Sequence, residues 1–180
     1  KKLLFWELEL ENIEDQSMVE ILESQKIEAN VQFGKFIERN YEDWFQPKAD
    51  KPILSHEIFG ELVAPEIRKK DQPILFVVID NLRYDQWKAF ESVVNNHYKL
   101  EKEVSYFSIL PTATQYARNA IFSGLTPLEM EKKFPQYWKN DPDEGGKNLY
   151  EGEFLTEQLK RLGLNIKQEY YKITNFASGK

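Results

Sequence analysis

The stretch "FVVIDNLRYDQW" (residues 76–87) joins an apolar run to a polar turn. The run starts earlier, and "PILFVVI" (73–79) is an unbroken series rich in β-branched and aromatic residues. Such a series is typical of a strand that is buried on both faces of a sheet. The predicted strand ends at Asp80. Because ligands bind beyond the carboxyl ends of strands in open α/β sheets, the position of this carboxylate favours a binding site.

Two further segments predict strands that would join the first one. They are "YKLEKEVSYFSI" (98–109) and "LNIKQEYYKI" (164–173). Helical patterns separate the strands and cover residues 83–94, 114–123, a short segment from Pro127, and 151–163. This alternation predicts an α/β fold over residues 71–180, with a mostly parallel sheet and flanking helices.

The first 70 residues have a different pattern. Apolar residues recur at helical spacing over 18–45, and a second helical pattern runs from about Ser55 to Lys70. The segment "KKDQP" (69–73) interrupts the pattern before the first predicted strand. We therefore expect a small all-α bundle at residues 1–70, followed by a separate α/β domain at residues 71–180.

Composition excludes several classes of protein. The chain has 180 residues, of which 41% are hydrophobic, and this is enough to build a packed core. It has no cysteine, which rules out disulfide frameworks and thiolate metal sites. No run approaches the roughly 20 apolar residues of a membrane span. The start lacks a methionine and turns acidic too early for a signal peptide. We expect a cytoplasmic protein whose chain continues beyond both ends.

Asp80 has two interpretations when it is considered alone. A carboxylate at the tip of a buried strand is suited to bind a metal cation. An Asp-Asn pair after a strand is also common in turns, because both side chains bond to nearby amides. The sequence of the turn does not separate these alternatives.

A second motif lies in "ILPTATQYARNAIFSG" (109–124). Thr112 and Thr114 stand just before or at the start of a predicted helix, where free amides and the helix dipole attract anions. A threonine at this place can be a nucleophile beside a phosphate site, or simply an N-cap. Together with Asp80, the motif favours a metal-assisted phosphoryl-transfer enzyme, in which a metal lowers the pKa of the hydroxyl and binds phosphoryl oxygens.

These motifs resemble those of a known family. "FVVIDNLRYDQW" and "LPTATQYARNAIFSGLTP" are similar to the PglZ domain of the alkaline phosphatase superfamily, and Pro-Thr-x-Thr followed by Ser-Gly-Leu-x-Pro also resembles its nucleotide pyrophosphatases. The segment "KKLLFWELELENIEDQSMVEILESQK" resembles the helical bundle of PorX-like response regulators, which are linked to type IX secretion.

The resemblance implies a zinc-dependent phosphodiesterase with two zinc ions, acting on cyclic or linear oligonucleotides. It also implies a receiver domain before this segment, a homodimer on activation, and a secretion-complex or sigma-factor partner. Carried over by position, Asp80 matches the first metal-ligand aspartate. Thr114 matches the nucleophile that also bridges the metals, and Thr112 is the fallback nucleophile.

The resemblance also implies metal ligands that this segment does not supply. The superfamily completes its two-metal site with further Asp and His residues downstream, whereas this chain has only His56 and His97. We expect both histidines to be surface residues. The isolated segment is therefore predicted to bind zinc weakly and to be inactive, with half of the site present.

Three polar residues near the motifs are candidates for substrate binding. Arg83 lies in the first turn of a predicted helix, where a cation opposes the dipole, and so it needs a partner: Asp80, Asp85 or a bound phosphate. Arg118 and Asn119 follow Thr114 by one helical turn, and Arg118 at i+4 can reach an anion on the same face. The alternative for Arg118 is an ordinary solvent-facing arginine.

Two functions therefore remain open. The first is an enzyme, as part of a metal-dependent phosphodiesterase joined to a regulatory bundle. The second is a catalytically silent PglZ-like signalling platform that binds a secretion-complex or transcription-factor partner.

Overall fold

The computed structural model describes residues 2–10, 15–46, 50–69, 72–175 and 177–179. The chain divides into two compact units. The first unit comprises residues 1–51 and 81–103, and the second comprises residues 52–80 and 104–180. The domain boundary predicted at residues 70 and 71 lies outside the described residues, and it stays a prediction.

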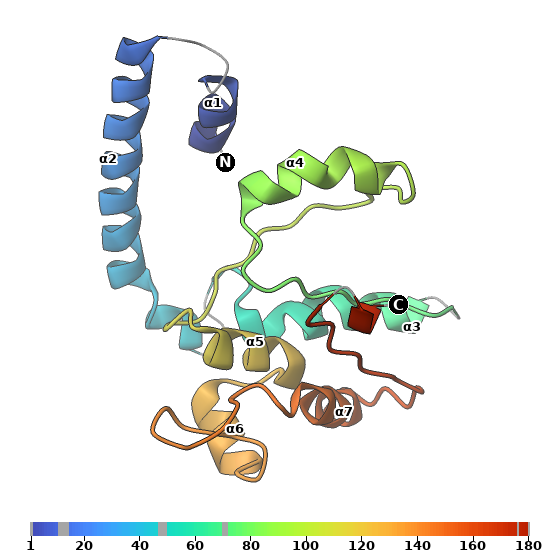
Figure 1. Cartoon of the computed structure of the whole chain (residues 1–180). Helices are drawn as coiled ribbons and strands as arrows, with labels where there is room; N and C mark the ends of the chain where they lie inside the picture. Colours follow the sequence, from blue (N-terminus) through green and yellow to red (C-terminus); the bar gives the residue numbers. More distant parts are fainter. Residues whose placement is uncertain (1, 11–14, 47–49, 70–71, 176, 180) are drawn as a thin grey trace. The chain divides into compact units, whose positions relative to one another are not determined.

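Helices form the first unit. They are α1 (Lys2–Leu10), α2 (Gln16–Asn40), the 3₁₀ turn η1 (Asp43–Phe45) and α4 (Tyr84–Asn95), with α1 beside α2 (Figure 1). Asp15 caps α2, because its carboxylate accepts a hydrogen bond from the Met18 backbone N–H at 3.1 Å. Within the described residues, no helix has both the length and the apolar character to cross a membrane.

The second unit carries the motifs. Its elements are the 3₁₀ turn η2 (Ser55–Glu57), the π turn η3 (Phe59–Val63), α3 (Ala64–Lys69), α5 (Thr114–Ser123), α6 (Pro127–Lys133), α7 (Glu151–Arg161) and the 3₁₀ turn η4 (Ala177–Gly179). Helix α5 packs against α7 and η2 (Figure 1). The core between these elements includes fully buried side chains of Leu54, Ile109, Ala120, Met130 and Phe154.

Local signals explain where α5 and α6 end and begin. Gly124 ends α5 in the left-handed conformation, with φ at 63°, which glycine adopts without a steric penalty. Pro127 occupies the first turn of α6, where its missing N–H costs nothing. Glu129 completes a capping box by accepting a hydrogen bond from the Thr126 backbone N–H at 3.0 Å. The helix predicted at residues 114–123 is confirmed at both ends.

The predicted α/β fold is wrong. Segments 73–79, 98–109 and 164–173 contain no strand, and the described residues hold a single isolated parallel bridge, between Leu54 and Phe107. The apolar run is not buried as a strand would be, because Leu75, Val77 and Ile79 are 81%, 62% and 55% exposed.

The physical reason is that a strand is not a local structure. A run of β-branched residues has the propensity to be extended, but a sheet exists only where a second segment pairs with its backbone groups. In the described residues the three predicted strands do not pair with one another, and helices supply most of the buried core. The structure is therefore helical with extended connections, not a parallel sheet.

Candidate functional site

Asp80 follows the extended segment 73–79 and begins a turn. The next residue, Asn81, has φ at 57°, a left-handed conformation that asparagine tolerates better than most residues. The Asp80 side chain is 44% exposed. The turn therefore leaves one face of this carboxylate open to solvent.

Thr114 lies beside Asp80 although 34 residues separate them in sequence. Its Oγ1 donates a hydrogen bond to Asp80 Oδ2 at 3.5 Å, which is the long end of the range for such a bond. Thr114 is the first residue of α5, and the N-cap before it is Ala113, whose side chain has no oxygen to cap the helix. The structure thus brings the two motif residues together at a helix start. Thr112 lies exposed in the loop before α5.

Arg118 completes a cluster around the same carboxylate oxygen. Its Nη1 donates to Asp80 Oδ2 at 2.8 Å, and it lies one helical turn after Thr114. Asp80 Oδ2 therefore accepts from a hydroxyl and from a guanidinium at once. Arg118 therefore shares a face of α5 with Thr114, and its partner here is a carboxylate of the protein. Its predicted contact with substrate stays a prediction.

Glu151 is the member of the site that sequence reasoning missed. It is the first residue of α7, and its side chain is only 2% exposed. Arg118 Nε donates to Glu151 Oε1, and the Tyr170 hydroxyl donates to Glu151 Oε2 at 2.5 Å. Lys172 Nζ lies 3.6 Å from the same Oε2. In the sequence, Glu151 looks like an ordinary acid in the first turn of a helix.

The surroundings of Tyr170 change the pKa of its hydroxyl. Burial raises the pKa of its hydroxyl, and the hydrogen bond to the Glu151 carboxylate raises it further, because both disfavour the phenolate. Tyr170 therefore stays protonated across the physiological range and remains a donor to Glu151.

Asn119 is buried, with 1% of its surface exposed. Its Nδ2 donates to the Lys147 carbonyl at 3.0 Å, and its Oδ1 accepts from Asn148 Nδ2 at 3.0 Å. Asn148 Nδ2 also donates to the Thr114 carbonyl at 3.3 Å. Asn119 and Asn148 thus tie the loop before α7 to α5, which is a structural role. Its predicted contact with substrate stays a prediction.

The first turn of α5 has a second attachment to the same loop. Gln115 Nε2 and the Tyr116 hydroxyl donate to the two carboxylate oxygens of Asp141, the latter at 2.8 Å. These bonds, that from Gln115 first, lower the pKa of Asp141, because they stabilise its charged form. The helix start that carries Thr114 is therefore held on more than one side.

Arg83 belongs to the first unit and precedes α4. Of the partners considered for it, the structure shows Asp85: Arg83 Nη2 donates to Asp85 Oδ2 at 2.6 Å and Nε to Oδ1 at 3.0 Å. The hydrogen bond from Arg83 lowers the pKa of Asp85 to about 2. A contact between Arg83 and a phosphate stays a prediction.

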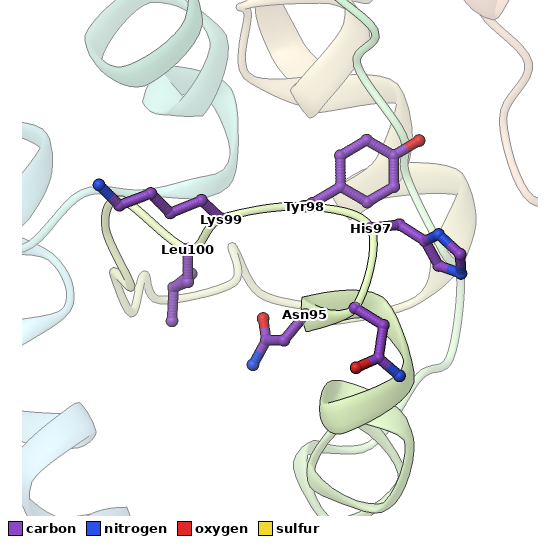
Figure 2. A pocket seen from close by; sticks show the side chains of 6 residues that line it. Asn95, His97, Tyr98, Lys99 and Leu100 are labelled. Carbon is purple, nitrogen blue, oxygen red and sulfur yellow. The ribbon is translucent and has the colours of Figure 1, made fainter.

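The two histidines differ in their exposure. His97 is exposed, as expected, whereas His56 in η2 is half-buried and its Nδ1 is shielded from solvent. His97 lines an open depression of about 480 Å³ formed by residues 95–100 of the first unit. Figure 2 shows His97 and Lys99 pointing in opposite directions, so these two side chains do not converge on one ligand position.

The described residues do not by themselves fit a zinc ion. Asp80 and Thr114 supply two oxygen donors, whereas a catalytic zinc ion has about three protein ligands. Within the described ranges, no group of three or more His, Cys, Asp or Glu side chains could hold a metal. The Arg118 guanidinium also occupies the Asp80 oxygen that faces Thr114.

Comparison with known proteins identifies the family. Residues 58–178, more than half of the chain, match the family model of the BREX system PglZ alkaline phosphatase-like domain. The chain belongs to the PglZ family. Both Asp80 and Thr114 lie inside the matched PglZ domain. Residues 1–45 match the PorX response regulator linker domain. A search of curated proteins found no match.

The two matches agree with the resemblance found from the motifs. A response regulator linker precedes an alkaline phosphatase-like domain, so the chain is that of a PorX-like, PglZ-containing protein. The cluster of Asp80, Thr114, Arg118 and Glu151 is the candidate site of this PglZ domain.

Proposed function

We propose that this chain supplies part of the active site of a metal-dependent phosphodiesterase, with Thr114 as the nucleophile. The observation that carries the proposal is the contact between Thr114 Oγ1 and Asp80 Oδ2 at 3.5 Å, at the start of a helix. The PglZ match supports a hydrolase of the phosphatase superfamily.

In the proposed reaction, Thr114 Oγ1 gives its proton to solvent and forms a bond to phosphorus while the bond to the leaving ester oxygen breaks, and that oxygen takes up a proton from solvent. A water molecule then cleaves the phosphothreonine ester, which releases the phosphate product and restores the hydroxyl. Asp80 accepts the hydrogen bond of the hydroxyl and orients its lone pairs toward the phosphorus. The amides in the first turn of α5 lie where phosphoryl oxygens would be bound, because helix N-termini attract anions. Phosphoryl transfer needs mostly such positioning and charge compensation.

Zinc belongs to the proposal as the implied cofactor. Asp80 and Thr114 would be two of its ligands, and further ligands would have to come from outside the described residues. The proposed substrates are cyclic or linear oligonucleotides, and the proposed role is regulation of type IX secretion by a protein that dimerises and binds a secretion-complex or sigma-factor partner. The match to the PorX linker supports this role.

The test is turnover of bis(p-nitrophenyl) phosphate by the full-length protein with added zinc. Thr114→Val removes the hydroxyl and keeps the shape of the side chain, and we expect a loss of kcat on the order of 10³-fold or more. Thr112→Val is the matched control, and we expect it to stay near the wild-type rate. Activity that survives in Thr114→Val and disappears in Thr112→Val would move the nucleophile to Thr112.

The second candidate is a signalling platform without catalysis. The observation that favours it is the ion pair between Arg118 and Asp80, because it occupies the carboxylate oxygen that a metal would need. The zinc content of the purified full-length protein separates the two functions. Near-stoichiometric zinc supports the enzyme, whereas a protein without zinc supports the platform.

A further inference from the structure

We propose that Glu151 is a positioning residue for the Thr114–Asp80 pair and that it acts through Arg118. The inference rests on the proposed function, because it names what orients the proposed nucleophile. Glu151 is far from the motifs in sequence, and among the described residues no hydrogen bond or ion pair joins it to Thr114. Its influence passes through a single guanidinium that bonds to both carboxylates.

The burial of Glu151 is the first step of the argument. A carboxylate that is 2% exposed has lost nearly all of its contact with water. Such a group is retained only where donors or cations replace the water. Here Arg118 and Tyr170 donate hydrogen bonds, and Lys172 adds an ion pair. Two other elements of the second unit, α5 and the segment 164–173, therefore converge on this side chain of α7.

The division of its two oxygens is the second step. Tyr170 and Lys172 both approach Oε2, and Arg118 Nε donates to Oε1. Lys172 is itself held, because it donates to the Asn148 carbonyl at 2.7 Å. With Oε2 anchored in this way, Oε1 has a defined direction, and Arg118 is attached to it.

The geometry of the guanidinium is the third step. The group is planar and rigid, so the bond from Nε to Glu151 determines where Nη1 points. Nη1 donates to Asp80 Oδ2, the oxygen that also accepts from Thr114. The two ends differ in exposure: the side chain is 2% exposed for Glu151 and 44% exposed for Asp80. The buried end is therefore the anchor, and the exposed Asp80 is the group that it orients.

Glu151→Gln in the full-length protein is the direct test. The amide keeps the size of the side chain but removes the charge that holds Arg118. We expect kcat for bis(p-nitrophenyl) phosphate to fall by about 10- to 100-fold with KM unchanged, because a small misplacement of the nucleophile costs that much. Glu153→Gln is the matched control, since Glu153 lies on the same helix α7 and is exposed. We expect it to behave as wild type.

A second variant decides the matter if Glu151→Gln does not fold. Arg118→Lys keeps the charge but cannot reproduce the fork that reaches both carboxylates. A fall in kcat with KM unchanged supports positioning. A rise in KM with kcat unchanged overturns the proposal, because Arg118 would then bind substrate directly. Wild-type kinetics also overturn it.

A double-mutant cycle of unfolding free energies tests the coupling between Asp80 and Glu151 without relying on activity. Asp80→Asn, Glu151→Gln and the double variant are compared by urea unfolding, followed through hydrogen exchange in α5. If Arg118 couples the two carboxylates, the effect of Asp80→Asn is smaller when Glu151 is already changed. Strict additivity overturns the inference.

The outcomes also separate the inference from the proposed function. Activity that survives in Thr114→Val refutes the proposed nucleophile, while the double-mutant cycle still tests whether Glu151 is coupled to Asp80. If Thr114→Val is inactive and Glu151→Gln has wild-type kinetics, the function stands and the positioning role of Glu151 is wrong.

Discussion

Replacing Arg118 by leucine is predicted to destabilise the second unit, and the loss comes mainly from one of its two ion pairs. Arg118 donates to Glu151, whose side chain is 2% exposed, and to Asp80, whose side chain is 44% exposed. The variant Arg118→Leu removes both pairs at once. It keeps an apolar stem of similar length.

The magnitude follows from burial. Removing one partner of a buried pair costs about 3–5 kcal/mol, because the remaining charge stays buried without compensation. Tyr170 and Lys172 still contact Glu151, so we expect the lower end, about 3 kcal/mol. The partly exposed pair with Asp80 adds about 0–1 kcal/mol. Asp80→Asn alone should therefore cost much less than Arg118→Leu.

The assay is urea-induced unfolding, read from hydrogen exchange of the α5 amides so that it reports the second unit. Arg83→Leu is the control: it removes an ion pair of the first unit, and we expect it to leave the stability of α5 unchanged. The double variant Arg118→Leu with Glu151→Leu should recover much of the loss, because no buried charge is left unpaired. A loss below about 1 kcal/mol in Arg118→Leu, equal to that in Asp80→Asn, would refute the reasoning.

Three further outcomes are expected. The isolated 180-residue chain should bind zinc weakly in a calorimetric titration and should not turn over a phosphodiester, because its described residues offer two zinc ligands. Zinc-dependent turnover by this chain would contradict the prediction that the zinc site is incomplete. Gly124→Ala should lower the melting temperature more than Gly163→Ala. Both glycines have positive φ, but a Cβ added at Gly124 would clash with the Gln158 side chain, whereas none of the described atoms lies within 4 Å of a Cβ added at Gly163. Arg83 lowers the pKa of Asp85 to about 2, so the stability that this ion pair contributes is present above the ordinary aspartate pKa and is lost as pH falls toward 2. An NMR titration of Asp85 in wild type and in Arg83→Gln measures this shift. An equal Asp85 pKa in both proteins would contradict the prediction.

Several parts of the site could be predicted because their signals are local. The end of α5 follows from Gly124, whose left-handed conformation stops the last turn. The contact between Asp80 and Thr114 is long-range, and composition or periodicity alone would not have suggested it. It was suggested by the arrangement of two motifs that resemble one family, and the matching segment supports that resemblance.

Other parts could not be predicted because they depend on pairing between distant segments. The run 73–79 has the propensity of a strand, but propensity does not supply the second segment that a ladder needs. Glu151 has no local signal either, since its partners Arg118 and Tyr170 lie 33 and 19 residues away. Its importance becomes visible only when its burial is known.

The sequence by itself determined the helices around the motifs, the carboxylate and the hydroxyl of the candidate site, and the family. These depend on residues that act within a few positions of one another or on a motif that is read directly. Only the tertiary structure decided that the described residues form no sheet, and that a buried glutamate from α7 holds the arginine between Asp80 and itself. The reason is physical: strand pairing and the desolvation of a charge are properties of segments brought together in space, and their free energies do not exist in the isolated segments.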